Sequence, residues 1–134
     1  MRFDIFLEIE SVEKTIAFYV NELKMFDFSH NFGNGNILLK HKKSSICLST
    51  ILKKSIDNPN ANSFAIQVED CKKEFERIKK IEFSNNSGIS PFPNGNEFIE
   101  HPLGIMFYLK DPFGNEFSIF EDYYDFLGKD AKKY

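Results

Sequence analysis

The chain of 134 residues has no tryptophan, only two cysteines, and no apolar run long enough for a membrane-spanning helix. Such a helix needs about 20 consecutive apolar residues, so we expect no membrane segment. The first ten residues alternate and carry acids, and they lack the basic start and apolar run of a secretion signal. Cys47 and Cys71 belong to no paired motif, which predicts free thiols in a reducing, cytoplasmic setting.

The chain also lacks an excess of positive charge. The 17 lysines and arginines are outnumbered by 20 acids, and the formal net charge is −3. Nucleic acids are bound by a clustered basic face, so we expect no nucleic-acid partner. The densest basic segments, Lys40, Lys42 and Lys43 and then Lys53–Lys54, are interpreted as solvated turns or strand ends.

Phenylalanine, in contrast, is abundant. The 16 phenylalanines are spread from Phe3 to Phe126, and apolar residues make up 42% of the chain. This length and apolar content predict one domain with a substantial core. The frequent Asn, Lys, Ile and Phe are typical of a bacterial protein from an AT-rich genome.

The first half begins with an alternating segment, residues 3–10, which predicts a half-buried strand. Ser11 is suited to cap a helix, and apolar residues at helical spacing predict that helix over residues 12–24. Short strands are expected at about 25–31, 35–40 and 45–51, separated by turn-forming residues 33–35 and 41–44.

The second half repeats this order of elements. Residues 62–69 alternate, Asp70 is suited to cap a helix over about 71–80, and strands are expected at about 97–101, 104–110 and 115–121. Residues 85–96 are predicted to be a loop, residues 111–115 a tight turn, and residues 122–127 a terminal helical turn. A constant offset of 59 residues relates Ile5, Leu7, Ile9 and Ser11 to Phe64, Ile66, Val68 and Asp70.

The predicted fold class is therefore α+β, with two βαβββ modules in a single domain over residues 1–134. The first module covers about residues 1–57 and the second about residues 62–127, joined by the breaker-rich residues 57–61. We do not expect either half to fold alone, because each small sheet must bury a face.

Two segments resemble the vicinal oxygen chelate superfamily: SVEKTIAFYVNEL at residues 11–23 and KDPFGNEFSIFE at residues 110–121. This superfamily includes glyoxalase I, extradiol dioxygenases, fosfomycin resistance proteins and bleomycin-binding proteins. The resemblance covers about residues 3–121. It implies curled mixed sheets that enclose a cleft, and it implies a homodimer.

In metal-dependent members of this superfamily, His, Gln or Glu ligands occupy positions that match Asp4, Ser63 and Ser118 here, with a fourth near Cys47 or Ser49. Serine hydroxyls are poor ligands, and one carboxylate does not hold a catalytic metal. None of the three histidines stands at a matched position. We therefore expect no metal at this site and no cofactor.

Strand periodicity places further residues on the face that carries these positions. Tyr108 stands three residues before Asp111, where the resemblance implies a ligand-facing tyrosine. The candidate ligand-binding residues are Asp4, Phe6, Glu8, Cys47, Ser49, Ser63, Gln67, His101, Tyr108, Ser118 and Phe120. Several of these residues can also have a simpler role. Phe6 and Phe120 can simply fill the interior, and Cys47 can be no more than a small buried residue. Glu8 can pair with a lysine at the rim, Asp4 can be a carboxylate at the strand end, and His101 can lie in a loop.

The favoured function is metal-independent binding of a small molecule, which would sequester an antibiotic or metabolite. The alternative is a lyase, isomerase or transferase of the same superfamily that uses a shifted metal set or acid–base catalysis by Asp4 and Glu8. A third interpretation is an interaction module whose cleft no longer binds a ligand. Whether the chain is an enzyme is left open by the sequence.

Overall fold

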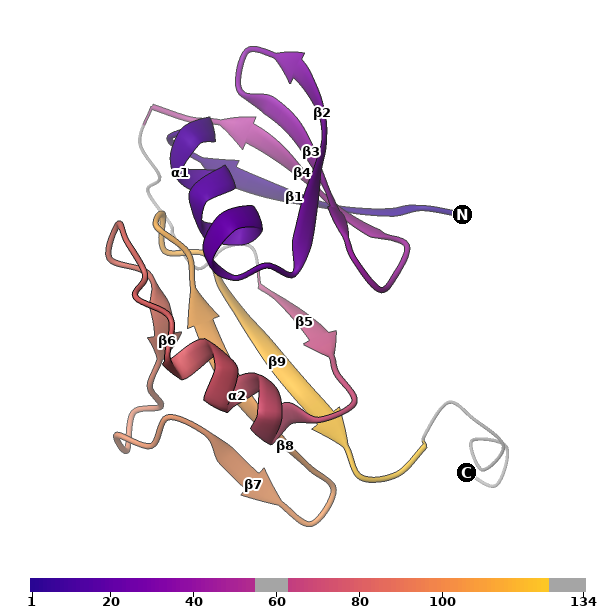
Figure 1. Cartoon of the computed structure of the whole chain (residues 1–134), viewed down its shortest axis with the longest axis vertical. Coiled ribbons are helices and arrows are strands. Elements are labelled where there is room, and N and C mark those ends of the chain that lie inside the picture. Colours follow the sequence, from indigo (N-terminus) through magenta and orange to yellow (C-terminus); the bar gives the residue numbers. More distant parts are fainter. Residues whose placement is uncertain (55–62, 126–134) are drawn as a thin grey trace.

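We describe residues 1–54 and 63–125 of a computed structural model of the chain (Figure 1). The first half forms β1 (Phe3–Ile9), α1 (Val12–Ile16), the π-helix η1 (Ala17–Glu22), β2 (Phe26–Gly33), β3 (Asn36–His41) and β4 (Ile46–Leu52). The second half forms β5 (Phe64–Gln67), α2 (Cys71–Lys79), β6 (Gly88–Ser90), β7 (Ile99–His101), β8 (Gly104–Lys110) and β9 (Glu116–Asp122). No helix of the described residues is long and apolar enough to cross a membrane.

Both predicted helix caps are confirmed. The Ser11 hydroxyl accepts a hydrogen bond from the Lys14 backbone N–H at 3.2 Å, and the Asp70 carboxylate accepts one from the Lys73 N–H at 3.0 Å. These oxygens satisfy backbone donors that the first helical turn leaves unpaired. The helix expected over residues 12–24 is present as α1 followed without interruption by the wider turns of η1.

Each half has its own mixed sheet. The strand order is β1-β4-β3-β2 in the first sheet and β5-β9-β8-β6 in the second, where β7 also pairs with β8. The outer strand of the second sheet is thus split into β6 and β7, whereas β2 is continuous. In both sheets the first strand of the module pairs in parallel with the last. This shared topology supports the repeat that the sequence predicts.

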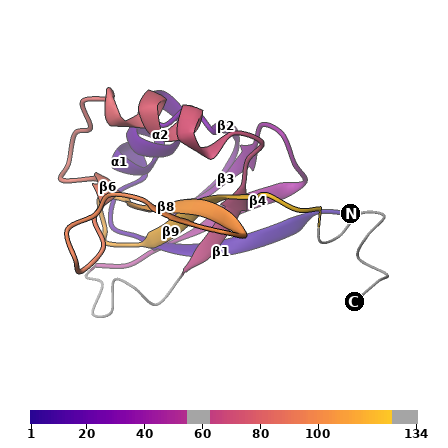
Figure 2. The ribbon, with the colours of Figure 1, turned by 90° about the horizontal axis from the view of Figure 1, so that it is seen from below.

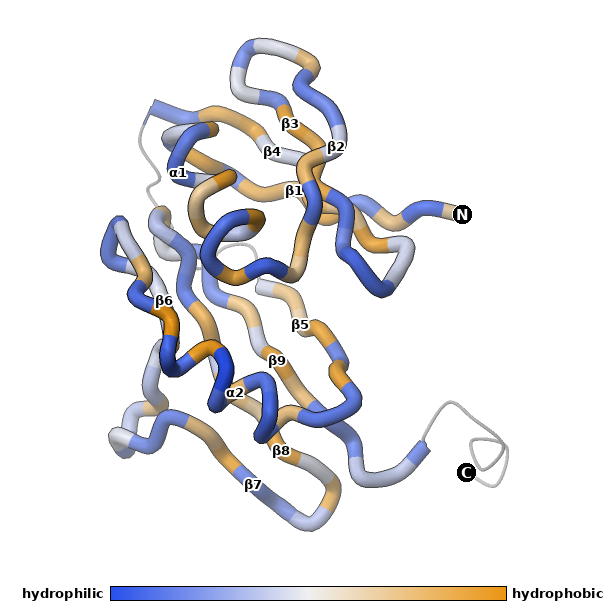
Figure 3. The backbone as a smooth tube through the Cα atoms, in the orientation of Figure 1, coloured by the Kyte–Doolittle hydropathy of each residue, from blue (hydrophilic) through white to orange (hydrophobic). Residues whose placement is uncertain are grey.

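The helices lie on one side of the two sheets, as the view in Figure 2 shows. Strand residues that face this side are fully buried, for example Leu7 in β1, Leu48 in β4 and Phe117 in β9. Figure 3 shows apolar stretches along the strands of both sheets and polar turns at their ends. The sheets do not close around an interior, and no described element covers the face opposite the helices.

Polar contacts fasten the two halves to each other. The Tyr19 hydroxyl of η1 donates to the buried Asp111 carboxylate at 2.9 Å, and the Asn115 amide donates to the Glu8 carbonyl at 2.9 Å. The Arg77 guanidinium of α2 donates to the Leu23 carbonyl at 3.0 Å. These contacts fix the relative position of the sheets and hence of their open faces.

The predicted turn at residues 111–115 is the centre of this junction. Asp111 accepts hydrogen bonds from the backbone N–H groups of Phe113 and Asn115, both at 2.9 Å. Gly114 has a φ of +86°, a left-handed conformation that glycine adopts without a steric penalty. The segment therefore places Asp111 where Tyr19 can reach it.

The structure differs from the sequence prediction in the loop expected at residues 85–96, since Gly88–Ser90 form β6 there. This strand has only three residues, and its pairing with β8 rather than a local pattern defines it. The terminal helical turn expected at residues 122–127 is wrong in its described part, because Asp122 is the last residue of β9 and residues 123–125 form no helix. The predicted linker at residues 57–61 and residues 126–127 lie outside the described residues.

Candidate functional site

A hollow of about 760 Å³ lies on the open face of the first sheet. This volume is in the range of small-molecule pockets. Buried Leu38 and Cys47 contribute apolar surface to it, and charged or hydroxyl-bearing side chains stand around them. The residues that line this first-sheet hollow are Met1, Arg2, Ser29, His30, Phe32, Leu38, Lys40, Ser44, Ser45 and Cys47.

The register of the sheet explains why these residues meet. Lys40 of β3 pairs with Cys47 of β4, and Cys47 pairs with Asp4 of β1. Side chains of directly paired residues point to the same face of a sheet. A single row across three strands therefore carries a cation, a thiol and a carboxylate on the open face.

Aromatic rings border the hollow on β2. The rings of His30 and Phe32 are stacked, with centroids 5.8 Å apart and an interplanar angle of 8°. The Ser29 hydroxyl lies 2.7 Å from His30 Nδ1, and this contact orients the imidazole. Since 66% of the Phe32 surface is exposed, these rings offer a face on which a planar molecule can stack.

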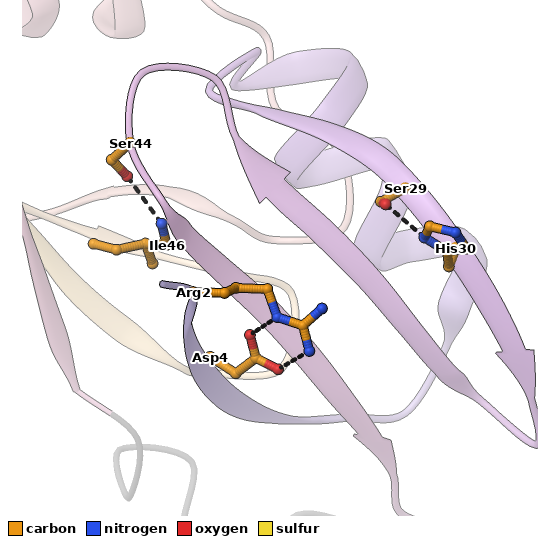
Figure 4. A network of polar contacts seen from close by, with 6 residues as sticks. All are labelled: Arg2, Asp4, Ser29, His30, Ser44 and Ile46. Carbon is orange, nitrogen blue, oxygen red and sulfur yellow. Dashed lines mark hydrogen bonds and ion pairs between the residues drawn. The ribbon is translucent and has the colours of Figure 1, made fainter.

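Arg2 and Asp4 form a two-pronged ion pair (Figure 4). Arg2 Nε lies 2.8 Å from Asp4 Oδ1, and Nη2 donates to Oδ2 at 3.0 Å. Such paired contacts fix the guanidinium plane. Nη1 is the guanidinium nitrogen that this pair leaves for another acceptor.

The predicted residues of the first half all lie on the open face, but only Cys47 lines the first-sheet hollow. Glu8 pairs with Lys53 at 2.6 Å, which is the rim pairing that the sequence left open. Phe6 is 58% exposed and lies opposite half-buried Ser49 in the β1–β4 pair. The two candidate carboxylates, Asp4 and Glu8, are therefore each held by a cation.

The predicted residues of the second half lie on the second sheet and its edge, and none lines the first-sheet hollow. Ser118 pairs with Ala65 of β5 and Tyr108 of β8, as Ser49 pairs with Phe6 and Leu38 in the first sheet. Ser118 is buried, Tyr108 and Phe120 are half-buried, and Ser63, Gln67 and His101 are exposed. The two groups of candidates thus lie on two different sheets.

The donors at the superfamily's metal positions do not fit a catalytic metal. Asp4 gives both carboxylate oxygens to Arg2, while Ser63 and Ser118 offer neutral hydroxyls from the other sheet. Within residues 1–54 and 63–125, no group of three or more His, Cys, Asp or Glu side chains is placed to hold a metal ion. The metal-free site remains a prediction, and metal analysis is its test.

The strongest titration shifts lie at the helix side, away from the hollow. Burial raises the pKa of Tyr19 well above its usual value, and Asp111 adds to this effect. Burial also raises the pKa of Asp111, although hydrogen bonds from Asn115, Phe113 and Tyr19 oppose the rise. Burial raises the pKa of Cys71 to about 12, so this free thiol is unsuited to nucleophilic chemistry near neutral pH.

Sequence reasoning missed most residues of the first-sheet hollow, including Arg2, His30, Phe32 and Lys40. The position of Lys40 could have been predicted from the strands expected at 35–40 and 45–51. These strands form a hairpin in which Lys40 and Leu38 share a face with Cys47 and Ser49. The positions of His30 and Phe32 could not be predicted in this way. The register of β2 shifts between Phe28 and His30, and the alternation of residues along the sequence does not indicate that shift.

The fold is shared with solved structures of low sequence identity. No family model matches the chain, and no curated protein matches it either. TnmS3, an antibiotic binding protein from Streptomyces sp. CB03234, is 15% identical with a TM-score of 0.68, over 91% of this chain and 95% of that one. A putative glyoxalase family protein from Bacillus anthracis is also 15% identical, with a TM-score of 0.67 over 91% of this chain and 94% of that one.

A fosfomycin resistance protein, FosX from Listeria monocytogenes, is 17% identical with a TM-score of 0.63, over 88% of this chain and 89% of that one. The similarity to this group of proteins confirms the α+β fold of paired modules and the resemblance to the vicinal oxygen chelate superfamily at the level of fold. At such low identities the likeness concerns the fold alone.

Proposed function

We propose that this protein binds a small organic molecule in the first-sheet hollow, without a metal, and so sequesters an antibiotic or a metabolite. The observation that carries the proposal is the hollow itself, about 760 Å³ in volume, with apolar Leu38 and Cys47, stacked aromatic rings and a few polar groups. Small-molecule sites typically combine apolar walls with sparse polar anchors.

Binding is favoured over acid–base catalysis by the state of the candidate carboxylates. Asp4 is paired with Arg2, and Glu8 is paired with Lys53. A general base needs a lone pair that can reach the substrate proton, and both carboxylates already direct oxygens at cations. The antibiotic-binding and fosfomycin-resistance neighbours support a small-molecule ligand for this fold.

We also propose that the protein works as a cytoplasmic homodimer in which a second copy packs against Phe6 and Ile51 on the open face, beside the first-sheet hollow, and leaves the hollow accessible. Phe6 and Ile51 lie on this face with 58% and 43% of their surfaces exposed. Burial of such side chains between copies is favourable by about 25 cal/mol for each Å² of apolar surface removed from water. Sedimentation velocity is expected to give a dimer, and Phe6→Glu to give a monomer. A wild-type monomer at all concentrations would contradict this part of the proposal.

The ligand proposal is tested by a thermal-shift screen of antibiotics and aromatic metabolites, together with metal analysis of the purified protein. A ligand that binds only the folded protein raises its Tm. We expect hits whose shift is lost in Phe32→Ala, which removes the stacking ring of the hollow. Phe98→Ala is the matched control, because Phe98 is an exposed phenylalanine that lines a separate hollow beside α2.

Two results would count against this function. Stoichiometric transition metal, retained after dialysis, would contradict metal-independent binding. Hits that respond to Phe98→Ala and not to Phe32→Ala would place the ligand elsewhere on the chain.

A further inference from the structure

We propose that the ligand of the first-sheet hollow is a planar aromatic molecule that carries an anionic group, such as an aromatic carboxylate or sulfonate. This inference rests on the proposed function and adds the chemical class of the ligand.

The lining of the hollow contains cations and no acid. Arg2 and Lys40 line it, and Asp and Glu are absent from its lining residues. The whole chain has the opposite balance, with a formal net charge of −3. The acid next to the hollow, Asp4, is engaged by Arg2 through both of its oxygens. Because the Arg2–Asp4 pair is neutral overall, Lys40 is the side chain that gives the lining its net positive charge, and a cationic ligand would meet no acid in the lining.

Lys40 is the cation best placed to attract an anion. Among residues 1–54 and 63–125 it takes part in no ion pair. On the neighbouring strand β4 it pairs with Cys47, which is not charged like an acid or a base. On its other side it pairs with Asp27, but that carboxylate lies 3.9 Å from Lys42 Nζ. The basic segment that looks like a solvated turn in the sequence thus places one of its lysines in the hollow.

Hydroxyl groups stand close to these cations. Ser29, Ser44 and Ser45 all line the hollow. Figure 4 shows Arg2 between Ser44 on one side and Ser29 with His30 on the other. A serine hydroxyl donates one hydrogen bond, and the hydroxyls of Ser29 and Ser44 lie 2.7 Å and 2.8 Å from the Nδ1 atoms of His30 and His41. These two hydroxyls can donate to the oxygens of a carboxylate or sulfonate when the proton of that contact is on Nδ1.

The aromatic part of the ligand is indicated by the stacked rings of His30 and Phe32. Their planes are within 8° of each other, so they form a flat edge to the hollow. Leu38 and Cys47 are only 5% and 4% exposed and form the floor of the hollow, so the apolar surface open to a ligand is mainly the Phe32 ring, which is 66% exposed. An aromatic anion would cover this ring, whereas an anion without an apolar body would leave it in water.

The experiment measures the affinity of three probes of nearly equal shape: 2-naphthoate, neutral 2-naphthamide and cationic 2-naphthylmethylammonium. We expect naphthoate to bind about five-fold more tightly than naphthamide, with the ammonium probe weakest, because a charged partner is gained at a partly exposed site. The preference should diminish in high salt, which screens the charges.

Variants separate the charge from the stacking surface. Lys40→Gln should abolish most of the preference for naphthoate over naphthamide, while Lys80→Gln, a matched change on the helix side, should leave it intact. Phe32→Ala should lower the affinity for all three probes by a similar factor. Circular dichroism confirms that each variant is folded.

The outcomes distinguish this inference from the proposed function. Equal affinities for naphthoate and naphthamide, or a preference that survives Lys40→Gln, would overturn the anionic ligand class and leave small-molecule binding in place. Failure of every probe and every screened compound to bind would overturn the proposed function itself.

Discussion

The buried hydrogen bond between Tyr19 and Asp111 gives the sharpest stability prediction. The hydroxyl of Tyr19 donates to Asp111 Oδ2 at 2.9 Å, across 92 positions of sequence. Tyr19→Phe removes one oxygen and leaves the ring in place against Phe18, Phe26 and Phe117. The change therefore tests the bond that joins the two halves and leaves the aromatic core packed.

The expected cost is about 2 kcal/mol of unfolding free energy, because a hydrogen bond to a charged group contributes roughly 1.5–3 kcal/mol. Asp111 keeps its donors from Phe113 and Asn115, so the loss should not reach the cost of an unpaired buried charge. For a chain of 134 residues, an unfolding entropy of about 2.1 cal/mol/K per residue converts this loss into a Tm decrease of about 7 °C.

The assay is urea and thermal unfolding followed by circular dichroism. Tyr108→Phe is the matched control, since it removes a hydroxyl from a half-buried tyrosine on the open face. The loss should also shrink as the pH is lowered from 7 into the range where Asp111 takes up its proton, because the bond favours the ionised form of Asp111, whose pKa burial raises. A change below about 0.5 kcal/mol in Tyr19→Phe, or a loss equal to that of the control, would refute the reasoning.

Three further predictions concern other parts of the chain. Gly104→Ala should destabilise the protein by about 1–3 kcal/mol in urea unfolding, because an added Cβ would lie 2.3 Å from the Glu121 carbonyl oxygen; an unchanged midpoint would contradict this. Burial first and the Lys43 charge second lower the pKa of His41, so stability should fall as the pH drops below about 6.5, where the unfolded state takes up the proton. His41→Asn should weaken that pH dependence in unfolding curves between pH 5 and 8, and an unaltered slope would exclude this histidine as its source. Asp70→Ala should cost about 1 kcal/mol of unfolding free energy through the lost cap of α2, and Asp70→Asn should cost less; equal losses would point to charge rather than capping.

Much of the fold could be predicted because its signals are local. Alternation along residues 3–10 reflects a strand with one buried face, and Leu7 and Ile9 are indeed fully buried. The caps Ser11 and Asp70 act within three residues, so their neighbours in sequence suffice to identify them. The turn at Asp111 is likewise specified by its own residues.

The candidate site was harder to predict because its residues meet through pairing between strands. The first-sheet hollow depends on the register of β2, which a bulge shifts before His30, and on the alignment of Lys40 with Cys47. The state of Asp4 and Glu8 depends on whether Arg2 and Lys53 reach them, which spacing does not reveal. The partner of a long side chain depends on which strands lie next to its own, and that is a property of the folded sheet.

The sequence by itself determined most of the elements, the helix caps, the turn at residues 111–115 and the repeat of two modules, since each depends on residues close along the chain, whereas β6 depends on its pairing with β8. Only the tertiary structure decided that the helices of both halves lie on one side, that Tyr19 of the first half meets Asp111 of the second, and that the open face of the first sheet is lined by cations beside stacked rings. The physical reason is that hydrogen-bonded registers and burial act between strands far apart in sequence, and they select which of the exposed polar residues face one another.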